Sequence, residues 1–356
     1  MDKKKVLFFG IFDKNYPRNR IISLGLRENG WQVTNCKVDP KIGGLRKYWR
    51  LYQEYKKLED KKFDLVLVAF PGHTVVWLAR ILFGRKLIFD AHISLYDSNV
   101  FDRKIYPKFS FGAIKDWFLD WSSCSLAQKV LLDTYEHVSY FVDEFHISRS
   151  KFIRVLVGAD NTVFYPRKKQ INTKGEFTVH FHGTFIPLQG ISYIVEAANE
   201  LRDKTNIKFV IVGAGGELFE QTKAKVSELK LNNIIFTGRV PYKEVPSYIA
   251  KSNVCLGIFG NTPKARRVIP NKAYECVAMG IPTITAETAA IKELFTNKKD
   301  MLFCEIANGK DLAQKILFLK NNPAETEEIA NNGYQTFQNN VFPKEIGYRL
   351  IEDLGI

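Results

Sequence analysis

The sequence predicts an α/β protein made of two doubly wound domains, each a parallel sheet covered by helices. Short apolar runs, of the kind that parallel sheets bury on both faces, alternate with helical periodicity through most of the 356 residues. The alternation comes in two series, separated by the polar, aperiodic stretch Pro166–Gly175, which we interpret as an interdomain linker. The length suits two domains of about 150 to 190 residues, each with its own core.

The first series, residues 1–166, begins with a strand. The basic opening segment has only a short apolar run and no small-residue cleavage site, so we interpret it as that strand and not as a signal peptide. The predicted strands are Val6–Phe9, Val33–Cys36, Leu65–Phe70 and Leu87–Phe89. The predicted helices are Arg20–Asn29, Leu45–Glu59 and Thr74–Leu82, of which the first ends at Gly30 and the last at Gly84.

The second series, residues 167–342, repeats this order, and residues 343–356 are expected to form a final helix that packs back on the first domain. The predicted strands are Thr178–Phe181, Phe209–Val212, Ile234–Phe236, Val254–Ile258 and Thr283–Thr285. The predicted helices are Ile191–Arg202, Leu218–Leu229, Val245–Ala250, Ala273–Met279 and Asp311–Leu319. In doubly wound sheets ligands bind at the carboxyl ends of the strands.

Composition and charge narrow the possible functions. Hydrophobic residues make up 46% and charged residues 25%, which excludes a disordered or fibrous chain. The five cysteines are scattered without a C-x-x-C pair, which argues against a disulfide framework or zinc site and fits a reducing cytoplasm. No apolar run is long enough to span a bilayer. The net charge of +14 predicts an anionic partner: nucleic acid, an acidic membrane surface or a phosphorylated ligand.

Three segments between a strand and a helix have the character of anion-binding loops. Gly213-Ala-Gly215-Gly216 follows a strand, where glycines let backbone N–H groups approach a phosphate, although a tight structural turn uses the same residues. His182–Gly190 leads into another helix. In the third segment, Lys264, Arg266 and Arg267 precede Pro270 and a helix start, and Glu275 one turn later can accept hydrogen bonds from a ribose diol. The alternative for this third segment is a solvated basic loop with Glu275 as a surface charge.

The chain resembles the family-four-like glycosyltransferases of the GT-B fold over nearly its full length. The most specific element is Pro270-Asn-Lys-Ala-Tyr-Glu275-Cys-Val-Ala-Met-Gly280-Ile-Pro282, and the Gly183–Gly190 turn supports it. In the first half the resemblance lies in Tyr16-Pro-Arg18, Phe89-Asp-Ala-His92, Asp133-Thr134 and Gly158-Ala-Asp160. The resemblance implies two Rossmann-like domains that face each other across a cleft. It also implies a nucleotide-diphosphate sugar in the second domain, a glycan or lipid-linked acceptor in the first, and retaining, metal-independent transfer.

Carried over by position, the family's motifs fall on this chain with three departures. Glu275 matches the second glutamate of the family's Glu-x7-Glu motif, which is expected to bind the donor ribose, whereas Arg267 stands where the first glutamate would be. Thr184 and Gln189 occupy the positions of a basic pair aimed at the diphosphate. We expect Lys264, Arg266, Arg267 or Lys272 to supply the missing positive charge. The predicted donor-binding residues are Gly183, Thr184, Gln189, Gly213, Gly215, Arg266, Arg267, Pro270, Asn271, Lys272 and Glu275.

The predicted catalytic residues are His92, Lys264 and Asp97, and Asp13 and Arg18 are predicted to contact the acceptor. For His92 the alternative is a structural histidine, and for Asp13 and Arg18 it is helix capping and surface charge. His180 and His182 alternate on one strand and are interpreted as packing residues, because no third ligand for a metal is evident. The sequence contains no D-x-D diphosphate clamp, so we expect no metal and no other cofactor.

The segment Lys41–Lys62 predicts contact with an anionic membrane. It holds eight basic and three acidic residues, and aromatic side chains recur in it at helical spacing. The predicted membrane residues are Arg46, Lys47, Trp49, Arg50, Tyr52, Lys56 and Lys57, with a second aromatic and basic stretch at Tyr106–Trp121. The alternative is that the aromatic stripe packs on the sheet. No nucleic-acid-binding motif appears, so the predicted anionic partner is not a nucleic acid. We expect a cytoplasmic protein that associates with the inner face of the cell membrane.

Two other classes of function stay open at this stage. The departures at Thr184, Gln189 and Arg267 are compatible with a catalytically silent GT-B protein that binds a glycan or a nucleotide. The Gly213 turn is compatible with a Rossmann-type NAD oxidoreductase, although an acidic residue for the ribose is missing from the next strand.

Overall fold

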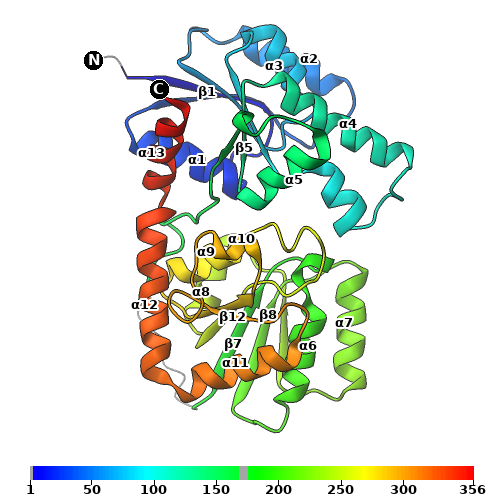
Figure 1. Cartoon of the computed structure of the whole chain (residues 1–356), viewed down its shortest axis with the longest axis vertical. Coiled ribbons are helices and arrows are strands. Elements are labelled where there is room, and N and C mark those ends of the chain that lie inside the picture. Colours follow the sequence, from blue (N-terminus) through cyan, green and yellow to red (C-terminus); the bar gives the residue numbers. More distant parts are fainter. Residues whose placement is uncertain (1–2, 168–174) are drawn as a thin grey trace. The chain divides into compact units, whose positions relative to one another are not determined.

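The computed structural model describes residues 3–167 and 175–356, so most of the predicted linker Pro166–Gly175 lies outside the described residues. The chain divides into two compact units (Figure 1). Unit 1 comprises the residues up to Gly158 together with Val341–Ile356, and unit 2 comprises Ala159–Asn340. The first boundary thus falls before the predicted one at residue 166. The physical reason is Phe164, whose buried ring packs 5.3 Å from that of Tyr242 in unit 2.

Unit 1 is built on a six-stranded parallel sheet in the order β2-β1-β3-β4-β5-β6. Its strands are β1 Lys5–Ile11, β2 Gln32–Val38, β3 Leu65–Val68, β4 Leu87–His92, β5 Lys129–Leu132 and β6 Phe152–Arg154. The first four match the predicted strands, and β3 and β4 are buried on both faces. The short strands β5 and β6 have no counterpart in the sequence prediction.

The helices of unit 1 fall into two layers. They are α1 Pro17–Glu28, α2 Arg46–Lys56, α3 Val76–Phe83, the π-helix η1 Asp97–Asp102, α4 Phe111–Leu126, α5 Tyr135–Phe145, the short 3-10 helix η2 Arg149–Lys151, and α13 Pro343–Leu354. The connections through α2 to α5 all advance in one direction across the sheet, whereas α1 leads back from β1 to β2. Because such crossovers are right-handed, α2 to α5 cover one face of the sheet and α1 covers the other.

Unit 2 is a second six-stranded sheet, in the order β12-β11-β10-β7-β8-β9. Its strands are β7 Phe177–His182, β8 Ile207–Val212, β9 Ile234–Gly238, β10 Val254–Leu256, β11 Thr283–Ala286 and β12 Leu302–Cys304. The helices are α6 Ile191–Glu200, α7 Glu217–Glu228, α8 Val245–Ile249, α9 Asn271–Ala278, α10 Ala289–Lys292, α11 Gly309–Asn321 and α12 Pro323–Asn340, with 3-10 turns η3 Pro187–Gln189 and η4 Tyr242–Glu244. The strand order reverses between β7 and β10, the kind of position where doubly wound folds bind ligands.

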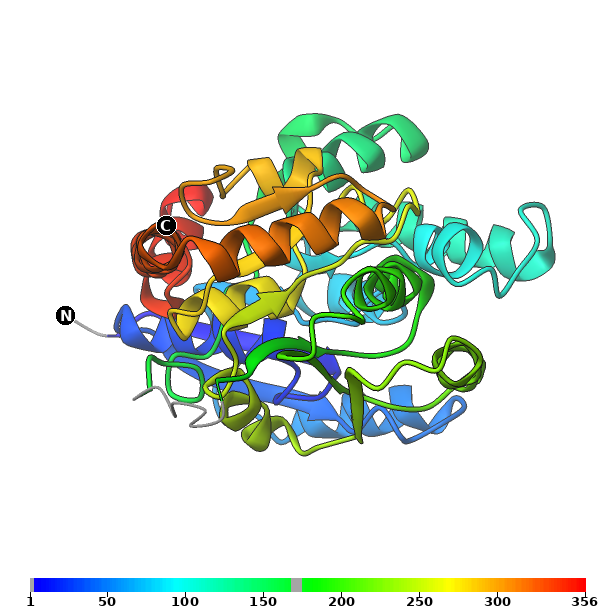
Figure 2. The ribbon, with the colours of Figure 1, turned by 90° about the horizontal axis from the view of Figure 1, so that it is seen from below.

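Each unit has its own apolar core, formed by the strands and the inner faces of the helices. In unit 2, α11 lies beside α6 and the two helices pack closely (Figures 1 and 2). The prediction of two successive doubly wound domains is confirmed.

The last helix returns to unit 1, where α13 packs against α1 without side chains between the backbones at the crossing. A Cβ placed on Gly25 of α1 would lie 2.1 Å from the carbonyl oxygen of Pro343 and 2.9 Å from the amide nitrogen of Gly347. A Cβ on Gly347 would meet Gly25 just as closely. The two glycines therefore set the distance between the helices.

Replacing Gly25 by Ala should separate α1 from α13 and lower the free energy of unfolding by about 1–3 kcal/mol, the usual cost of overpacking. Urea unfolding of the full chain measures this difference. Gly43→Ala is the matched control, because nothing lies within 4 Å of a Cβ there, and its effect should stay within about 0.5 kcal/mol. Equal stability of the two variants would contradict the close crossing.

Candidate active site

Two glycine turns meet at the carboxyl edge of the unit 2 sheet. Gly183 follows β7 and Gly213 follows β8, and both have positive φ angles. A Cβ on Gly213 would lie 2.1 Å from the carbonyl oxygen of Gly183, so the two turns touch backbone to backbone. The glycine at 213 is thus required by packing between neighbouring strand ends.

A cation that the sequence analysis did not identify lies over the second turn. Arg239 follows β9, is exposed, and donates from Nε to the carbonyl oxygen of Ala214 at 2.9 Å. Its Nη2 lies 2.7 Å from where a Cβ of Gly215 would stand. The sequence signal that could have identified Arg239 is its position shortly after the predicted strand Ile234–Phe236. In a parallel sheet this position falls at the same edge as the two glycine turns.

Lys272 of α9 brings a second cation to the first turn. Its Nζ donates a hydrogen bond to Oε1 of Gln189 and lies 3.7 Å from the ring centre of Phe181. The same Nζ would be 2.9 Å from a Cβ on Gly183. Burial lowers the pKa of Lys272 from 10.5 to about 7, although Cys276 and Glu275 oppose the shift. The side chain of Lys272 thus reaches position 189 from a different element of the same unit.

Glu275 ends a chain of buried polar side chains. Its Oε2 lies 2.8 Å from Nε2 of His182, its Oε1 accepts a hydrogen bond from the hydroxyl of Tyr242 at 3.2 Å, and Nδ1 of His182 lies 2.9 Å from Nε2 of His180. An ionised carboxylate only accepts, so His182 donates from Nε2 and, when neutral, accepts at Nδ1 from His180. His182 thus positions Glu275, a role that the sequence analysis missed. Two of the four acceptor directions of the carboxylate are used.

The structure brings some of the predicted donor residues into contact and shows how far the others are exposed. Gly183, Gln189 and Lys272 are in direct contact, and Glu275 lies one helical turn further along α9. Asn271 is the first residue of α9 after Pro270. Thr184 is exposed, Lys264 is buried, and Arg267 is half-buried. Arg266 lies on the surface and donates to Oδ1 of Asn261 at 2.6 Å. Among the described residues, no group of three or more His, Cys, Asp or Glu is placed to hold a metal ion.

In unit 1 the structure contradicts the prediction that Arg18 contacts the acceptor. Arg18 is fully buried, and its Nε and Nη2 donate to the carboxylate of Asp90 at 2.9–3.1 Å. Its Nη1 donates to the carbonyl oxygen of Val155, so one side chain ties α1 to β4 and to the segment after β6. Asp13 is exposed and accepts a hydrogen bond from the amide of Asn15 at 2.9 Å, which shapes the turn before α1.

His92 and Asp97, the predicted catalytic residues of unit 1, are both buried near the carboxyl end of β4. His92 has φ 57° and follows a register shift between Asp90 and His92 against β5. Its ring lies 5.0 Å from that of Phe70 and 6.3 Å from that of Tyr16. A left-handed non-glycine residue beside a bulge is typical of functional sites, which favours His92 as a functional residue. Asp97 opens η1, and its backbone amide donates to Ser94 Oγ at 2.9 Å.

These features define a pair of doubly wound units with a nucleotide-type site at the carboxyl edge of the second. Comparison with known proteins identifies the class. Residues 165–336, which make up most of unit 2, match the model of the family "Glycosyl transferases group 1".

One curated relative and two solved structures illustrate the similarity. An uncharacterized glycosyltransferase of Methanocaldococcus jannaschii is 26% identical over 153 residues, which are 43% of this chain and 41% of the relative. HepE of Anabaena, in complex with UDP and glucose, matches with TM-score 0.73 and 14% identity over 99% of this chain and 100% of its own. Sucrose-phosphate synthase of Thermosynechococcus elongatus matches with TM-score 0.76 and 15% identity over 98% of both chains. The fold is therefore GT-B, as predicted.

Arg18→Ala should destabilise unit 1 by about 3–5 kcal/mol at pH 7, because the buried carboxylate of Asp90 loses its partner. Denaturant unfolding monitors the loss. The control is Lys5→Ala, which removes the exposed ion pair with Asp60 and should cost no more than about 1 kcal/mol. If Arg18→Ala kept wild-type stability but lost acceptor binding, the original prediction for Arg18 would stand.

The low pKa of Lys272 predicts a stability that depends on pH in a defined direction. Between pH 7 and 10.5 the unfolded chain holds a proton on Lys272 that the folded chain has lost, so the free energy of unfolding rises with pH in this window. Relative to Lys272→Met, wild type should gain about 1 kcal/mol per pH unit between pH 7.5 and 9. Unfolding at several pH values tests this, with the exposed Lys225→Met as control. A pH-independent difference would show that Lys272 keeps an ordinary pKa.

Proposed function

We propose that the protein transfers a sugar from a nucleoside-diphosphate sugar to a hydroxyl group of a glycan or lipid-linked acceptor during assembly of a cell-surface polysaccharide. The observation that carries this proposal is the joint placement of Lys272, Gln189 and Gly183 beside the Glu275–His182 pair. The group around Lys272 suits a diphosphate, and the Glu275–His182 pair suits a ribose diol. Lys272 and Glu275 lie about one helical turn apart on α9.

The donor would be held by complementary parts of this edge. Backbone amides of the glycine turns and the cations Lys272 and Arg239 suit the diphosphate, and the free acceptor directions of Glu275 suit the ribose hydroxyl groups. HepE, which shares the fold, is known in complex with UDP and glucose, and this supports UDP-glucose as the first donor to test. A diphosphate beside Lys272 favours its charged form, so donor binding near pH 7 should take up protons.

The reaction would break the bond between the sugar C1 and a diphosphate oxygen and form a bond from C1 to the acceptor oxygen. The acceptor's proton passes to the departing diphosphate if the anomeric configuration is retained, as the family resemblance implies. The cations Lys272 and Arg239 would stabilise the leaving group, since charge that develops there meets fixed positive groups. This assignment gives a metal no role. We assign acceptor orientation to unit 1, with His92 as the candidate residue because of its strained backbone.

We also propose that the protein works at the cytoplasmic face of a membrane, where a lipid-linked acceptor resides. In α2 part of the aromatic stripe packs inward, since Tyr48 and Tyr55 pack against the apolar core of unit 1. Leu45 and Trp49 stay exposed, at 83% and 63%. The basic residues Arg46, Arg50, Lys56 and Lys57 are exposed and available to anionic headgroups, while Lys47 is half-buried. Within the described ranges, no helix has both the length and the apolar character needed to cross a bilayer.

A thermal-shift panel of UDP, GDP, ADP, CMP and their sugar conjugates, with NAD as a control, tests the proposed donor. One sugar nucleotide at about 100 times its Kd should add about 2.7 kcal/mol and raise the melting temperature measurably. Glu275→Gln should weaken that ligand about tenfold or more, because a charged acceptor for the ribose is lost. Release of the nucleoside diphosphate then measures turnover.

The matched control is Glu228→Gln, which changes an exposed glutamate of α7 paired with Lys225 and should leave donor affinity unaltered. No shift with any sugar nucleotide would reject the enzyme and favour a silent GT-B protein. A shift with NAD alone would favour an oxidoreductase, and an unchanged affinity in Glu275→Gln would remove Glu275 from the site.

A further inference from the structure

The segment from Ile93 to Trp121, which we call the projecting segment, distributes its charges in an unusual way. All four of its aspartates, Asp97, Asp102, Asp116 and Asp120, are buried, and all four of its cations, Arg103, Lys104, Lys108 and Lys115, are exposed. Every exposed ionisable side chain of the segment is therefore a cation, and that of Lys115 lies 3.5 Å from the carboxylate of Asp116. In Figures 1 and 2 the part of the segment between η1 and α4 extends away from the sheet of unit 1.

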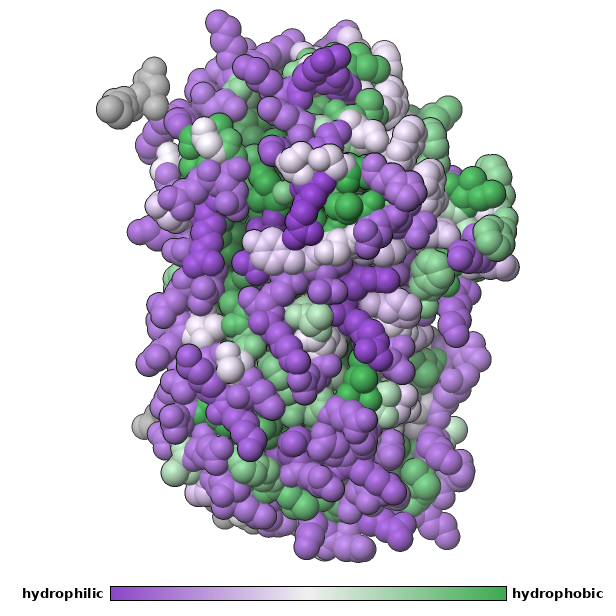
Figure 3. Space-filling model, viewed as in Figure 1, coloured by the Kyte–Doolittle hydropathy of each residue, from purple (hydrophilic) through white to green (hydrophobic). Residues whose placement is uncertain are grey.

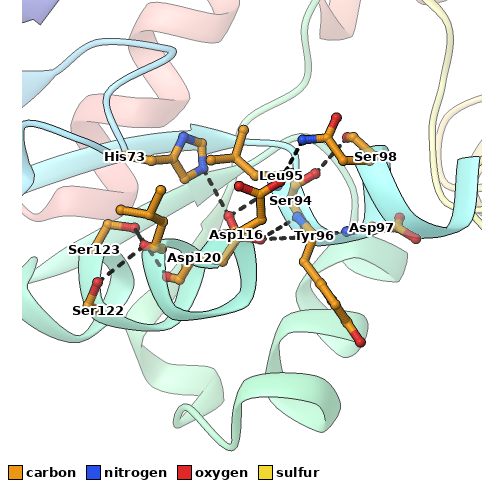
Figure 4. A network of polar contacts seen from close by, with 12 residues as sticks. His73, Ser94, Leu95, Tyr96, Asp97, Ser98, Asp116, Asp120, Ser122 and Ser123 are labelled. Atoms are coloured by element: carbon orange, nitrogen blue, oxygen red, sulfur yellow. Dashed lines mark hydrogen bonds and ion pairs between the residues drawn. The ribbon is translucent and has the colours of Figure 1, made fainter. Parts of the chain in front are cut away.

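The buried carboxylates hold the base of the projecting segment. Asp120 of α4 accepts hydrogen bonds from Ser94 Oγ at 2.7 Å and from the amides of Leu95 and Tyr96 at 3.1 and 2.9 Å (Figure 4). Asp116 accepts a hydrogen bond from the side-chain amide of Asn99 at 2.7 Å. These contacts fix the turn after β4 to the inner side of α4. The two aspartates of this helix, Asp116 and Asp120, thus point inward.

The outer side of α4 carries large apolar side chains instead. Phe109 is 83% and Phe111 is 85% exposed, and Ile114, Phe118 and Trp121 follow at helical spacing with exposed side chains. The ammonium group of Lys108 lies 5.6 Å from the ring centre of Phe109. In Figure 3 the segment shows as a group of hydrophobic side chains at the edge of unit 1. An amphipathic helix of a globular domain normally shows the reverse arrangement.

The exposed apolar side chains extend from α4 across the two neighbouring helices. Trp77 and Ile81 are exposed on α3, which packs beside α4, and the ring of Trp77 lies 5.8 Å from that of Tyr48 on α2. Leu45 and Trp49 complete the set at the start of α2. Since α2, α3 and α4 cover the same side of the sheet, these residues and the projecting segment form one surface, which we call the helix-layer face.

We propose that the helix-layer face docks on an anionic lipid bilayer, and that Phe109 and Phe111 insert below the headgroups. This inference rests on the proposed lipid-linked acceptor. It assigns insertion to α4 and the loop before it. The cations of α2 add an electrostatic contact. Exposed aromatic rings surrounded by lysines match the boundary between headgroups and acyl chains. The projecting segment exposes no carboxylate, so an anionic surface meets no like charge on the element that inserts.

Flotation of the full chain with vesicles tests the proposal. Wild type should bind vesicles of phosphatidylglycerol and phosphatidylcholine, and vesicles of pure phosphatidylcholine much less. The double variant Phe109→Ser, Phe111→Ser should bind the anionic vesicles about tenfold or more weakly. Ile235→Ser, which removes an exposed apolar side chain of unit 2, is the matched control and should bind like wild type. Equal binding by the double variant would overturn the assignment of the inserting element.

Insertion can be measured directly, because all five native cysteines are buried and a surface cysteine can be labelled alone. A fluorescent, environment-sensitive label on Phe111→Cys should shift to the blue on anionic vesicles and be quenched by lipids brominated in their acyl chains, whereas the label on Ile235→Cys should not. A label at position 111 that stays in water would reject insertion. If wild type binds no vesicles but forms a dimer, and the double variant is a monomer, this face is instead an interface between copies.

Nucleotide-sugar binding by the double variant separates this inference from the proposed function. The thermal shift with the donor should match that of wild type, because neither phenylalanine belongs to unit 2. Loss of vesicle binding with a normal donor shift supports the docking face. A normal vesicle interaction with no donor shift in any variant would instead reject the donor proposal while leaving the docking face in place.

Discussion

In both units every strand runs in the same direction, and this constraint decides where the chemistry can be. A parallel sheet is covered by helices on both faces, so its strands must be apolar along most of their length. Polar side chains that the core cannot hold collect where the strands end, at the carboxyl edge. In unit 1 this edge holds His92 and the buried pair of Asp90 and Arg18, and in unit 2 it holds His182 and the two glycine turns. The polar groups at these edges support one another, because an unpaired buried charge costs several kcal/mol.

At the proposed donor site of unit 2, a lysine from another element lies beside a position where the resembled family carries a basic residue. Position 189 carries glutamine where the resembled family carries a basic residue, and the Nζ of Lys272 from α9 donates a hydrogen bond to that glutamine. Lys272 differs from an exposed basic residue, because burial lowers its pKa to about 7 and its charge therefore changes with pH near neutrality. Arg239 adds an exposed cation at the neighbouring turn. The departures at Thr184 and Gln189 are thus compatible with a working diphosphate site.

The helix-layer face and the proposed donor site are separate parts of the fold with different chemistry. The proposed donor site consists of backbone turns, a buried carboxylate and cations within unit 2. The helix-layer face consists of exposed aromatic rings and lysines of unit 1. The Asp120 network connects the turn after β4, near His92, to the base of the projecting segment (Figure 4). The segment that leaves the acceptor domain's candidate edge therefore leads directly to the proposed membrane contact.

The sequence by itself determined the alternation of strands and helices and the two doubly wound domains, because periodicity and glycine turns are local signals. It did not reveal the strands β5, β6 and β12 or the helices α4, α5, α10 and α12. The three strands and α10 are short, and in α4 the apolar pattern is inverted by buried aspartates. Tertiary structure alone decided three roles. Arg18 is a structural ion pair, Lys272 replaces a charge from another element, and His182 orients Glu275. Each of these depends on which distant side chain lies within hydrogen-bonding distance, and the spacing of residues along a chain does not encode that distance.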